Sequence, residues 1–220
     1  IKSVSGLPLS PYFAAAKFAW AVENAPIPDR KNLCCGTVDS WLVFKLTGEF
    51  RTDYSNASRT QLFDLHTLRW SDSLCACFGL DPAWLPKLTD SNGFFGETDL
   101  EGYFPKPVPI HGVLGDSHGA LYGQGCLTPG SIKATYGTGS SVMMNVGSHL
   151  VSSEDIVTSL AWCMDGKAQY VLEGNINYSA AVIKWLEEDL QLISSAKEVE
   201  ALAKSARNMD GMYLVPAFSG

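Results

Sequence analysis

The chain has 220 residues and a net charge of −7, and its mean hydropathy is +0.03, which allows one sizeable core or two small ones. The excess of acidic side chains argues against a nucleic-acid partner, and no apolar run reaches the roughly eighteen residues of a membrane span. The first residues contain no signal-peptide core, so we expect a cytoplasmic protein. Six cysteines without a Cys-x-x-Cys pair indicate free thiols rather than disulfides or zinc ligands.

Two helices are predicted within the first fifty residues. Ser10-Pro11 is a helix start, and the segment from Tyr12 to Asn24 carries apolar residues at helical spacing. Thr37 is the predicted cap of a second helix, which ends at Thr47-Gly48. The polar segment 52–60 is open to two interpretations, a loop that faces a ligand or a capped structure, and we favour the capped structure.

The next fifty residues are predicted to form short elements. A strand and turn are expected over 62–70, followed by two short helices over 71–78 and 82–85. Residues 87–107 are rich in Gly, Asp, Pro and aromatic residues and show no periodicity. We therefore place a domain junction near the end of that segment, with domains at 1–107 and 108–220.

Asp116 is the first candidate for a catalytic residue. Val108, Ile110, Val113 and Leu114 predict a buried strand that ends at Gly115-Asp116, and a helix start is expected over 117–124. An aspartate at that point would lie near unpaired backbone N–H groups, which favour an ionised carboxylate. A plain helix cap is the alternative interpretation.

A glycine turn follows Asp116 at a short distance along the chain. Residues 131–136 and 141–145 are strand-like and are joined by Gly137-Thr138-Gly139. Glycines allow the backbone to approach a ligand closely, and successive N–H groups in such a turn can bind an anion. A phosphoryl transferase needs a carboxylate that accepts the proton of the attacking hydroxyl and a turn that binds phosphate. A plain hairpin turn is the other interpretation of these residues.

The last third of the chain predicts a second hairpin and further helices. Strands are expected over 158–163 and 167–172, joined at Asp165-Gly166. Helices are expected over 178–193 and 194–207, and a closing strand over 211–218.

Several segments in this order resemble the FGGY family of carbohydrate kinases, most closely its glycerol kinase branch. They are residues 6–13 (GLPLSPYF), 36–42 (GTVDSWL), 52–60 (TDYSNASRT), 115–116 (GD), 136–139 (YGTG), 172–174 (LEG) and 215–220 (VPAFSG). The resemblance covers essentially the whole chain. It implies an α/β actin-like ATPase fold of two ribonuclease-H-like domains, with the end of the first domain and the start of the second present here. It also implies that the chain is an internal piece of a longer polypeptide.

The same resemblance implies the roles of individual residues. Asp116 corresponds to the catalytic base and to a residue near Mg²⁺, and Tyr12 to a tyrosine that binds the polyol. The turn Gly137-Thr138-Gly139 corresponds to a turn that holds the phosphates of ATP. Ala180 and Lys184 stand where family members have a glycine and a glutamine near the nucleotide.

Two departures from the family pattern concern the substrate. Ser117 stands where a glutamine is expected and Ser141 where a phenylalanine is expected, and both changes enlarge and polarise the pocket. With His118 as a further polar partner, they favour a polyol or ketose larger than glycerol, because a site that hydrogen-bonds extra hydroxyls discriminates strongly. The family resemblance also implies a dimer or tetramer.

Three functions are compatible with these residues. The first is an ATP-dependent kinase that transfers the γ-phosphoryl group to a polyol or sugar hydroxyl. The second is a catalytically incomplete fragment or pseudokinase that keeps ligand or subunit contacts. The third is a hydrolytic relative that uses Asp116 to activate water.

Overall fold

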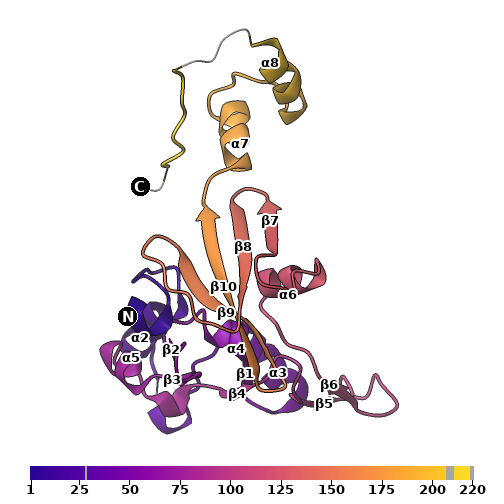
Figure 1. Cartoon of the computed structure of the whole chain (residues 1–220). Coiled ribbons are helices and arrows are strands. Elements are labelled where there is room, and N and C mark those ends of the chain that lie inside the picture. The colour runs from indigo at the N-terminus through magenta and orange to yellow at the C-terminus, as the bar shows by residue number, and fades with distance from the viewer. Residues whose placement is uncertain (28, 207–210, 219–220) are drawn as a thin grey trace. The chain divides into compact units, whose positions relative to one another are not determined.

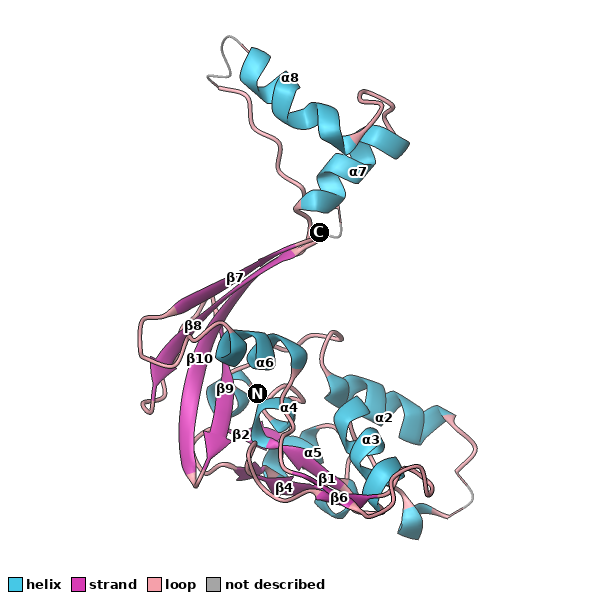
Figure 2. Ribbon diagram, turned by 90° about the vertical axis from the view of Figure 1, so that its right-hand side faces the viewer, coloured by secondary structure: helices cyan, strands magenta, loops and turns pink. Residues whose placement is uncertain are grey.

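The structure is a computed structural model that describes residues 1–27, 29–206 and 211–218. Helices and strands are mixed along the chain, as expected for an α/β protein (Figures 1 and 2). The chain forms two compact units: unit 1 comprises Ile1–Lys133 and Met143–Glu173, and unit 2 comprises Ala134–Val142 and Gly174–Gly220. No helix among the described residues is long and apolar enough to span a membrane.

Unit 1 contains most of the helices. They are α1 (Lys2–Ser5), α2 (Ala14–Asn24), α3 (Val38–Thr47), α4 (Tyr54–Ala57), α5 (Asp72–Cys77) and α6 (Asp116–Gly123), with 3-10 turns η1 (Arg30–Asn32) and η2 (Pro82–Trp84). Gly48 ends α3 in the left-handed conformation, as predicted, with φ 77°. Thr37 occupies the N-cap position of α3, but its hydroxyl donates to the Asp39 carboxylate instead of accepting from the helix.

The short strands of unit 1 form three two-stranded sheets. β1 (Arg51–Asp53) pairs in parallel with β4 (Lys87–Thr89). β2 (Phe63–Asp64) pairs antiparallel with β3 (Arg69–Trp70), and β5 (Gly96–Thr98) pairs antiparallel with β6 (Val108–Ile110). The polar segment between β1 and β2 is the capped structure that we favoured, because the Asp53 carboxylate accepts the Ser55 and Asn56 amides at the start of α4.

The largest sheet has four strands in the order β7-β8-β10-β9. They are β7 (Ile132–Tyr136), β8 (Ser140–Gly147), β9 (Val157–Met164) and β10 (Lys167–Ile176), and the boundary between the two units falls within β7, β8 and β10. Both predicted hairpins are confirmed. Asp165 and Gly166, which join β9 to β10, have φ values of 52° and 72°, as a two-residue hairpin turn requires.

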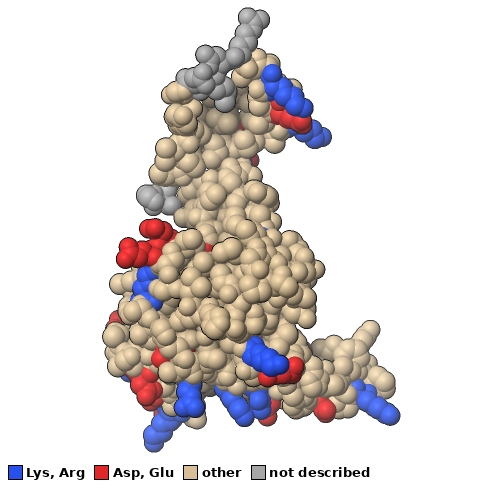
Figure 3. Space-filling view, viewed as in Figure 1, with Lys and Arg blue, Asp and Glu red and all other residues tan. Residues whose placement is uncertain are grey.

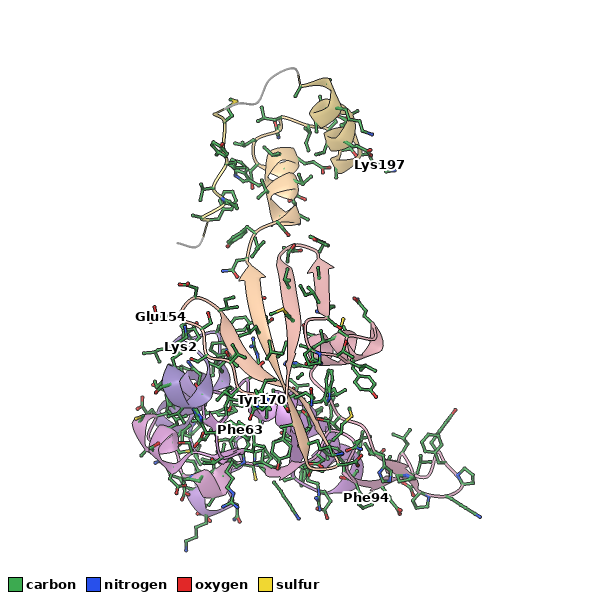
Figure 4. All side chains as sticks on the ribbon, viewed as in Figure 1. Lys2, Phe63, Phe94, Glu154, Tyr170 and Lys197 are labelled. Carbon is green, nitrogen blue, oxygen red and sulfur yellow. The ribbon has the colours of Figure 1, made fainter. Side chains whose placement is uncertain are left out.

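In the core of unit 1, the four-stranded sheet packs against short elements that precede it in the sequence. Leu160 and Tyr170 of the hairpin pack with Phe63 and Leu65 of the β2 region, and the Tyr170 hydroxyl donates to the Leu65 carbonyl at 2.9 Å (Figure 4). A second cluster joins Leu121 of α6 to Trp162 and Val171 of β9 and β10, together with Cys126, Met143 and Ala161. This packing holds α6 against the sheet.

Unit 2 contains α7 (Ala180–Glu188), the 3-10 turn η3 (Ala196–Glu198) and α8 (Val199–Ser205), which are labelled in Figure 2 except for η3. The predicted helix over 178–193 was too long at both ends. The predicted closing strand over 211–218 was wrong, because residues 212–217 have no regular structure. Arg207, the predicted end of the last helix, lies outside the described residues.

Two further predictions of unit 1 were wrong. The helix expected from Ser10-Pro11 begins only at Ala14, because the Ser10 hydroxyl instead accepts the Tyr12 amide in a local turn. The buried strand expected over 108–114 is only the three-residue β6, in which Val108 is 46% exposed. Prolines at 107 and 109 limit pairing to one edge there, since proline donates no N–H group.

Candidate functional site

A cavity of about 890 Å³ lies within unit 1, and both apolar and polar side chains line it. It is lined by residues from the start of α2, the start of α3, α4 and the start of α6. Those with polar side chains are Tyr12, Lys17, Thr37, Asp39, Asn56, Arg59, Asp116, Ser117, His118 and Glu173. Four predicted site residues, Tyr12, Asp116, Ser117 and His118, are therefore brought to one cavity.

Asp116 is the first residue of α6 and is exposed at the cavity. Its Oδ1 accepts the backbone N–H of Ser117 at 2.6 Å. The predicted placement of Asp116 at a helix start is confirmed, although a loop rather than a buried strand leads into it.

Tyr12 lies just before α2 and is 71% exposed. Its ring meets Phe13 edge-on at 5.3 Å, and Lys17 Nζ lies 5.9 Å from the ring centroid. The Lys17 ammonium also donates to the Tyr12 carbonyl at 2.7 Å. These contacts hold the backbone and ring of Tyr12 at the cavity wall while its phenol remains accessible.

Arg59 and Glu173 form an ion pair on the cavity wall, with 2.7 Å between Nη1 and Oε2. The Glu173 side chain is only 7% exposed, and the Arg59 guanidinium lies 5.3 Å from the centroid of the Phe13 ring. Sequence reasoning did not assign this pair to the site. The density of polar side chains over 52–60 was the available signal, and that segment turns out to cap α4 and to line the cavity.

His118 is directed into unit 1 and is only 4% exposed. Its Nε2 lies 3.5 Å from the Ser159 hydroxyl. Burial, with smaller contributions from the positive charges of Arg59 and Lys133, lowers the pKa of His118 from 6.5 to about 3. The imidazole is therefore neutral and acts as a polar neighbour of the cavity rather than as a charge.

The turn Gly137-Thr138-Gly139 lies in unit 2 and is bound to the start of α7. The carbonyl of Gly137 accepts the Ala180 amide at 3.0 Å, and that of Thr138 accepts the Ser179 and Ala181 amides at 2.9 and 3.1 Å. A Cβ atom at residue 139 would lie 2.9 Å from the Ile176 carbonyl oxygen, so only glycine fits. Because the turn satisfies the first amides of α7, an anion here would have to bind the turn rather than the helix start.

The remaining predicted residues also belong to unit 2. Ala180 and Lys184 line a groove of about 470 Å³ between α7 and the segment of η3 and α8. Lys184 is exposed and pairs with Glu188 at 3.5 Å on the same helix. Ser141 follows the turn in β8. The structure thus places four of the five predicted substrate residues in unit 1. Ser141, the fifth, belongs to unit 2 with the glycine turn, Ala180 and Lys184, and does not line the cavity of the other four.

The donors present fit a loosely held Mg²⁺ better than a metal bound by protein alone. Among residues 1–27, 29–206 and 211–218, no group of three His, Cys, Asp or Glu side chains could enclose a metal ion. Mg²⁺ commonly keeps several waters and binds one or two carboxylates together with substrate phosphates. The single exposed carboxylate of Asp116 is compatible with that mode of binding.

Comparison with known proteins gives consistent matches over the whole chain. Residues 1–123 match the N-terminal domain of the FGGY family of carbohydrate kinases. The chain is 48% identical to glycerol kinase 1 of Thermotoga maritima and 43% identical to the glycerol kinase of Rhodospirillum rubrum. Each alignment covers 100% of this chain and 46% of the relative. The chain therefore spans about half the length of the curated relatives it matches.

Solved structures agree with this assignment. Plasmodium falciparum glycerol kinase with ADP matches with a TM-score of 0.90 and 31% identity, over 100% of this chain and 45% of that chain. The ligand-bound xylulose kinase of Lactobacillus acidophilus matches with a TM-score of 0.78 and 18% identity, over 93% of this chain and 42% of that chain, which shows a shared fold. The predicted α/β fold of the actin-like ATPase class is confirmed.

Proposed function

Because the chain belongs to the FGGY family of carbohydrate kinases, we propose that it forms part of an ATP-dependent kinase that phosphorylates a hydroxyl group of a polyol or sugar. The observation that carries the proposal is the position of Asp116. An accessible carboxylate at a helix start borders a cavity whose other polar groups suit a molecule with several hydroxyls. Catalysis then needs a base at the acceptor and binding groups for the nucleotide.

Unit 1 is assigned to the acceptor. The Asp116 carboxylate accepts the proton of the attacking hydroxyl, and the hydroxyl oxygen forms the new bond to the γ-phosphorus as the bond to the ADP oxygen breaks. Tyr12 offers an exposed phenol for a second hydroxyl, and Ser117 and His118 line the same cavity. The Arg59–Glu173 pair supplies further donors and acceptors on the wall.

Unit 2 is assigned to the nucleotide. Backbone groups of Gly137, Thr138 and Gly139, with the Thr138 hydroxyl, would hold phosphate oxygens, and Ala180 and Lys184 would contact the nucleoside. Mg²⁺ would neutralise phosphate charge when bound, with Asp116 as its protein carboxylate. We also propose the predicted domain boundary, with an acceptor domain at 1–107 and a nucleotide domain at 108–220; Asp116, Ser117 and His118 lie after that boundary but belong to compact unit 1.

The acceptor is a polyol or sugar of at least glycerol size. Two relatives are named glycerol kinases, which makes glycerol the first compound to test. Serines at positions 117 and 141 favour a larger acceptor, because each adds a hydrogen-bonding group and removes bulk relative to the family pattern. All six cysteines are free thiols, which fits a reducing cytoplasmic setting. A dimer or tetramer remains part of the proposal.

An ADP-release assay tests this function directly. The protein expressed from its complete gene is mixed with ATP, Mg²⁺ and either glycerol, four- and five-carbon polyols or pentuloses. We expect turnover on at least one acceptor with one phosphorylated product per ADP. Asp116→Asn should lower kcat by about 10³-fold or more while ADP affinity, measured by calorimetry, stays within about threefold.

Three results would contradict the proposal. Near-normal turnover of Asp116→Asn would exclude Asp116 as the base. ADP release that does not depend on an acceptor would indicate hydrolysis, and a protein that binds ATP without any turnover would indicate a pseudokinase.

A further inference from the structure

Asp53 is a fully buried carboxylate that no proposed catalytic step uses. Its Oδ1 accepts the Ser55 hydroxyl at 2.9 Å and the backbone and side-chain amides of Asn56 at 2.9 and 2.8 Å. Its Oδ2 accepts the Ser55 backbone amide at 3.0 Å and the Ser91 hydroxyl at 2.8 Å. Five donors thus converge on one side chain, which is more than the cap of a four-residue helix needs.

The first connection from Asp53 leads to the residue before Asp116. Because the Ser55 hydroxyl gives its hydrogen to Asp53, its lone pairs face outward and accept the Gly115 backbone N–H at 2.9 Å. Gly115 is the N-cap of α6, and its carbonyl accepts the Gly119 amide at 2.7 Å. The start of the helix that carries Asp116 is therefore fastened to α4 through a single hydroxyl.

A second connection reaches the same loop through Ser91. The Ser91 side chain donates to Asp53, and its backbone carbonyl accepts the Val113 amide at 3.1 Å. Ser91 is also held to β9, since its hydroxyl accepts the Cys163 amide at 3.2 Å. Residues 111–115 have no regular structure, so these two hydrogen bonds, together with the packing of Leu114 against the Leu121 cluster, position the approach to Asp116.

The hydrogen-bond pattern around Asp53 indicates an ionised carboxylate. A protonated carboxyl at position 53 would direct its O–H toward groups that are themselves donors, so the pattern fits the ionised form. Burial raises the pKa of Asp53, and the bonds from Asn56, Ser55 and Ser91 oppose that rise. An ionised carboxylate makes each hydrogen bond shorter and stronger than a neutral acceptor would, which stiffens the whole cluster.

We infer that Asp53 is a positioning residue for the phosphoryl transfer: through Ser55 and Ser91 it fixes the Val113–Gly115 loop and thereby the place of the Asp116 carboxylate. This inference rests on the proposed function, in which Asp116 is the base. A displacement of a catalytic group by about 1 Å can reduce the rate about 100-fold without weakening substrate binding. The cluster would therefore act on kcat.

Ser55→Ala tests the connection, and Ser58→Ala is a matched control. Ser58 is equally buried, donates to the Ser55 carbonyl at 2.9 Å and accepts the Leu160 amide at 3.1 Å, so it loses a similar pair of hydrogen bonds. It contacts β9 and not the loop before Asp116. In the kinase expressed from its complete gene, Ser55→Ala should lower kcat by about 10- to 100-fold, with KM values for acceptor and ATP within about threefold. Ser58→Ala should leave kcat within about threefold of the unsubstituted enzyme.

A second variant protects the test against simple unfolding. If circular dichroism shows that Ser55→Ala is not folded, Ser55→Cys keeps the side-chain volume with a weaker acceptor and should show the same selective fall in kcat. Equal values of kcat in the Ser55 and Ser58 variants would overturn the inference. Asp116→Asn, assayed in parallel, separates the proposed function from the positioning role of Asp53. If Asp116→Asn is inactive while Ser55→Ala turns over normally, the proposed function stands and the positioning role is wrong. If Asp116→Asn is active, the proposed function is wrong, and the positioning role that rests on it is wrong as well.

Discussion

The buried ion pair between Arg59 and Glu173 allows a quantitative test of the cavity wall. Glu173→Gln keeps the shape of the side chain, removes its charge and leaves the Arg59 guanidinium facing a neutral group. At the effective dielectric constant of about 20 that suits buried sites, charges 2.7 Å apart attract by about 6 kcal/mol. The free-energy cost of removing the two charges from water offsets part of that attraction.

We expect Glu173→Gln to lower the free energy of unfolding by about 3 kcal/mol. This value is at the lower end of the range measured when one partner of a buried ion pair is removed, because the Arg59 side chain is 19% exposed. Arg59→Gln should cost a similar amount. The double variant should be less destabilised than the sum of the two single variants, by about 2 kcal/mol, because the direct contact between Arg59 and Glu173 is then lost only once.

Urea unfolding of the four proteins at neutral pH measures these differences. The exposed pair Lys184–Glu188 is the matched control, since both side chains are more than half exposed and lie one helical turn apart. Glu188→Gln should change stability by about 0.5 kcal/mol or less. The reasoning is refuted if Glu173→Gln costs no more than Glu188→Gln, or if the two single effects at positions 59 and 173 simply add.

Three other predictions concern separate parts of the chain. Thr138→Val should weaken ADP binding about tenfold by calorimetry, since it removes one hydroxyl from the proposed phosphate turn, and an unchanged affinity would count against that turn. Ellman's reagent at pH 8 should label the exposed Cys34 and Cys77 quickly and the four buried thiols only after denaturation, because burial raises the pKa of Cys75 to about 11 and of Cys163 to about 12. Rapid labelling of all six would contradict this. Phe63→Ala should reduce stability by about 3–5 kcal/mol in urea unfolding, because Phe63 is fully buried beside Tyr54 and Trp70; a loss below about 1 kcal/mol would show a loosely packed cluster.

Charged side chains of both signs are mixed on the visible face of the molecule (Figure 3). On the face shown in Figure 3, Lys and Arg side chains lie among Asp and Glu side chains rather than in one basic patch. Together with the net charge of −7, this face therefore lacks the concentrated positive charge that attracts phosphate backbones.

Much of the local structure was determined by the sequence alone. Gly48 ends α3, Asp165-Gly166 joins β9 to β10, and Gly137-Thr138-Gly139 joins β7 to β8, as the residue types require. The helix start at Asp116 was likewise predictable. Such features depend on the φ preferences and hydrogen bonds of a few consecutive residues, so local patterns are sufficient to identify them. The order of the motifs also identified the family.

The tertiary structure decided what the polar residues outside these motifs do. Arg59 and Glu173 are far apart in the sequence, and only the packing of α4 against β9, next to β10, makes them partners on the cavity wall. Asp53 reads locally as a helix cap, and only the fold brings Ser91 to its carboxylate and Gly115 to Ser55. The apolar residues at 108–114 predicted a buried strand, but neighbouring elements leave most of that segment outside the core. The physical reason is common to all three: burial and long-range pairing depend on which distant segments are in contact, and periodicity within one segment does not contain that information.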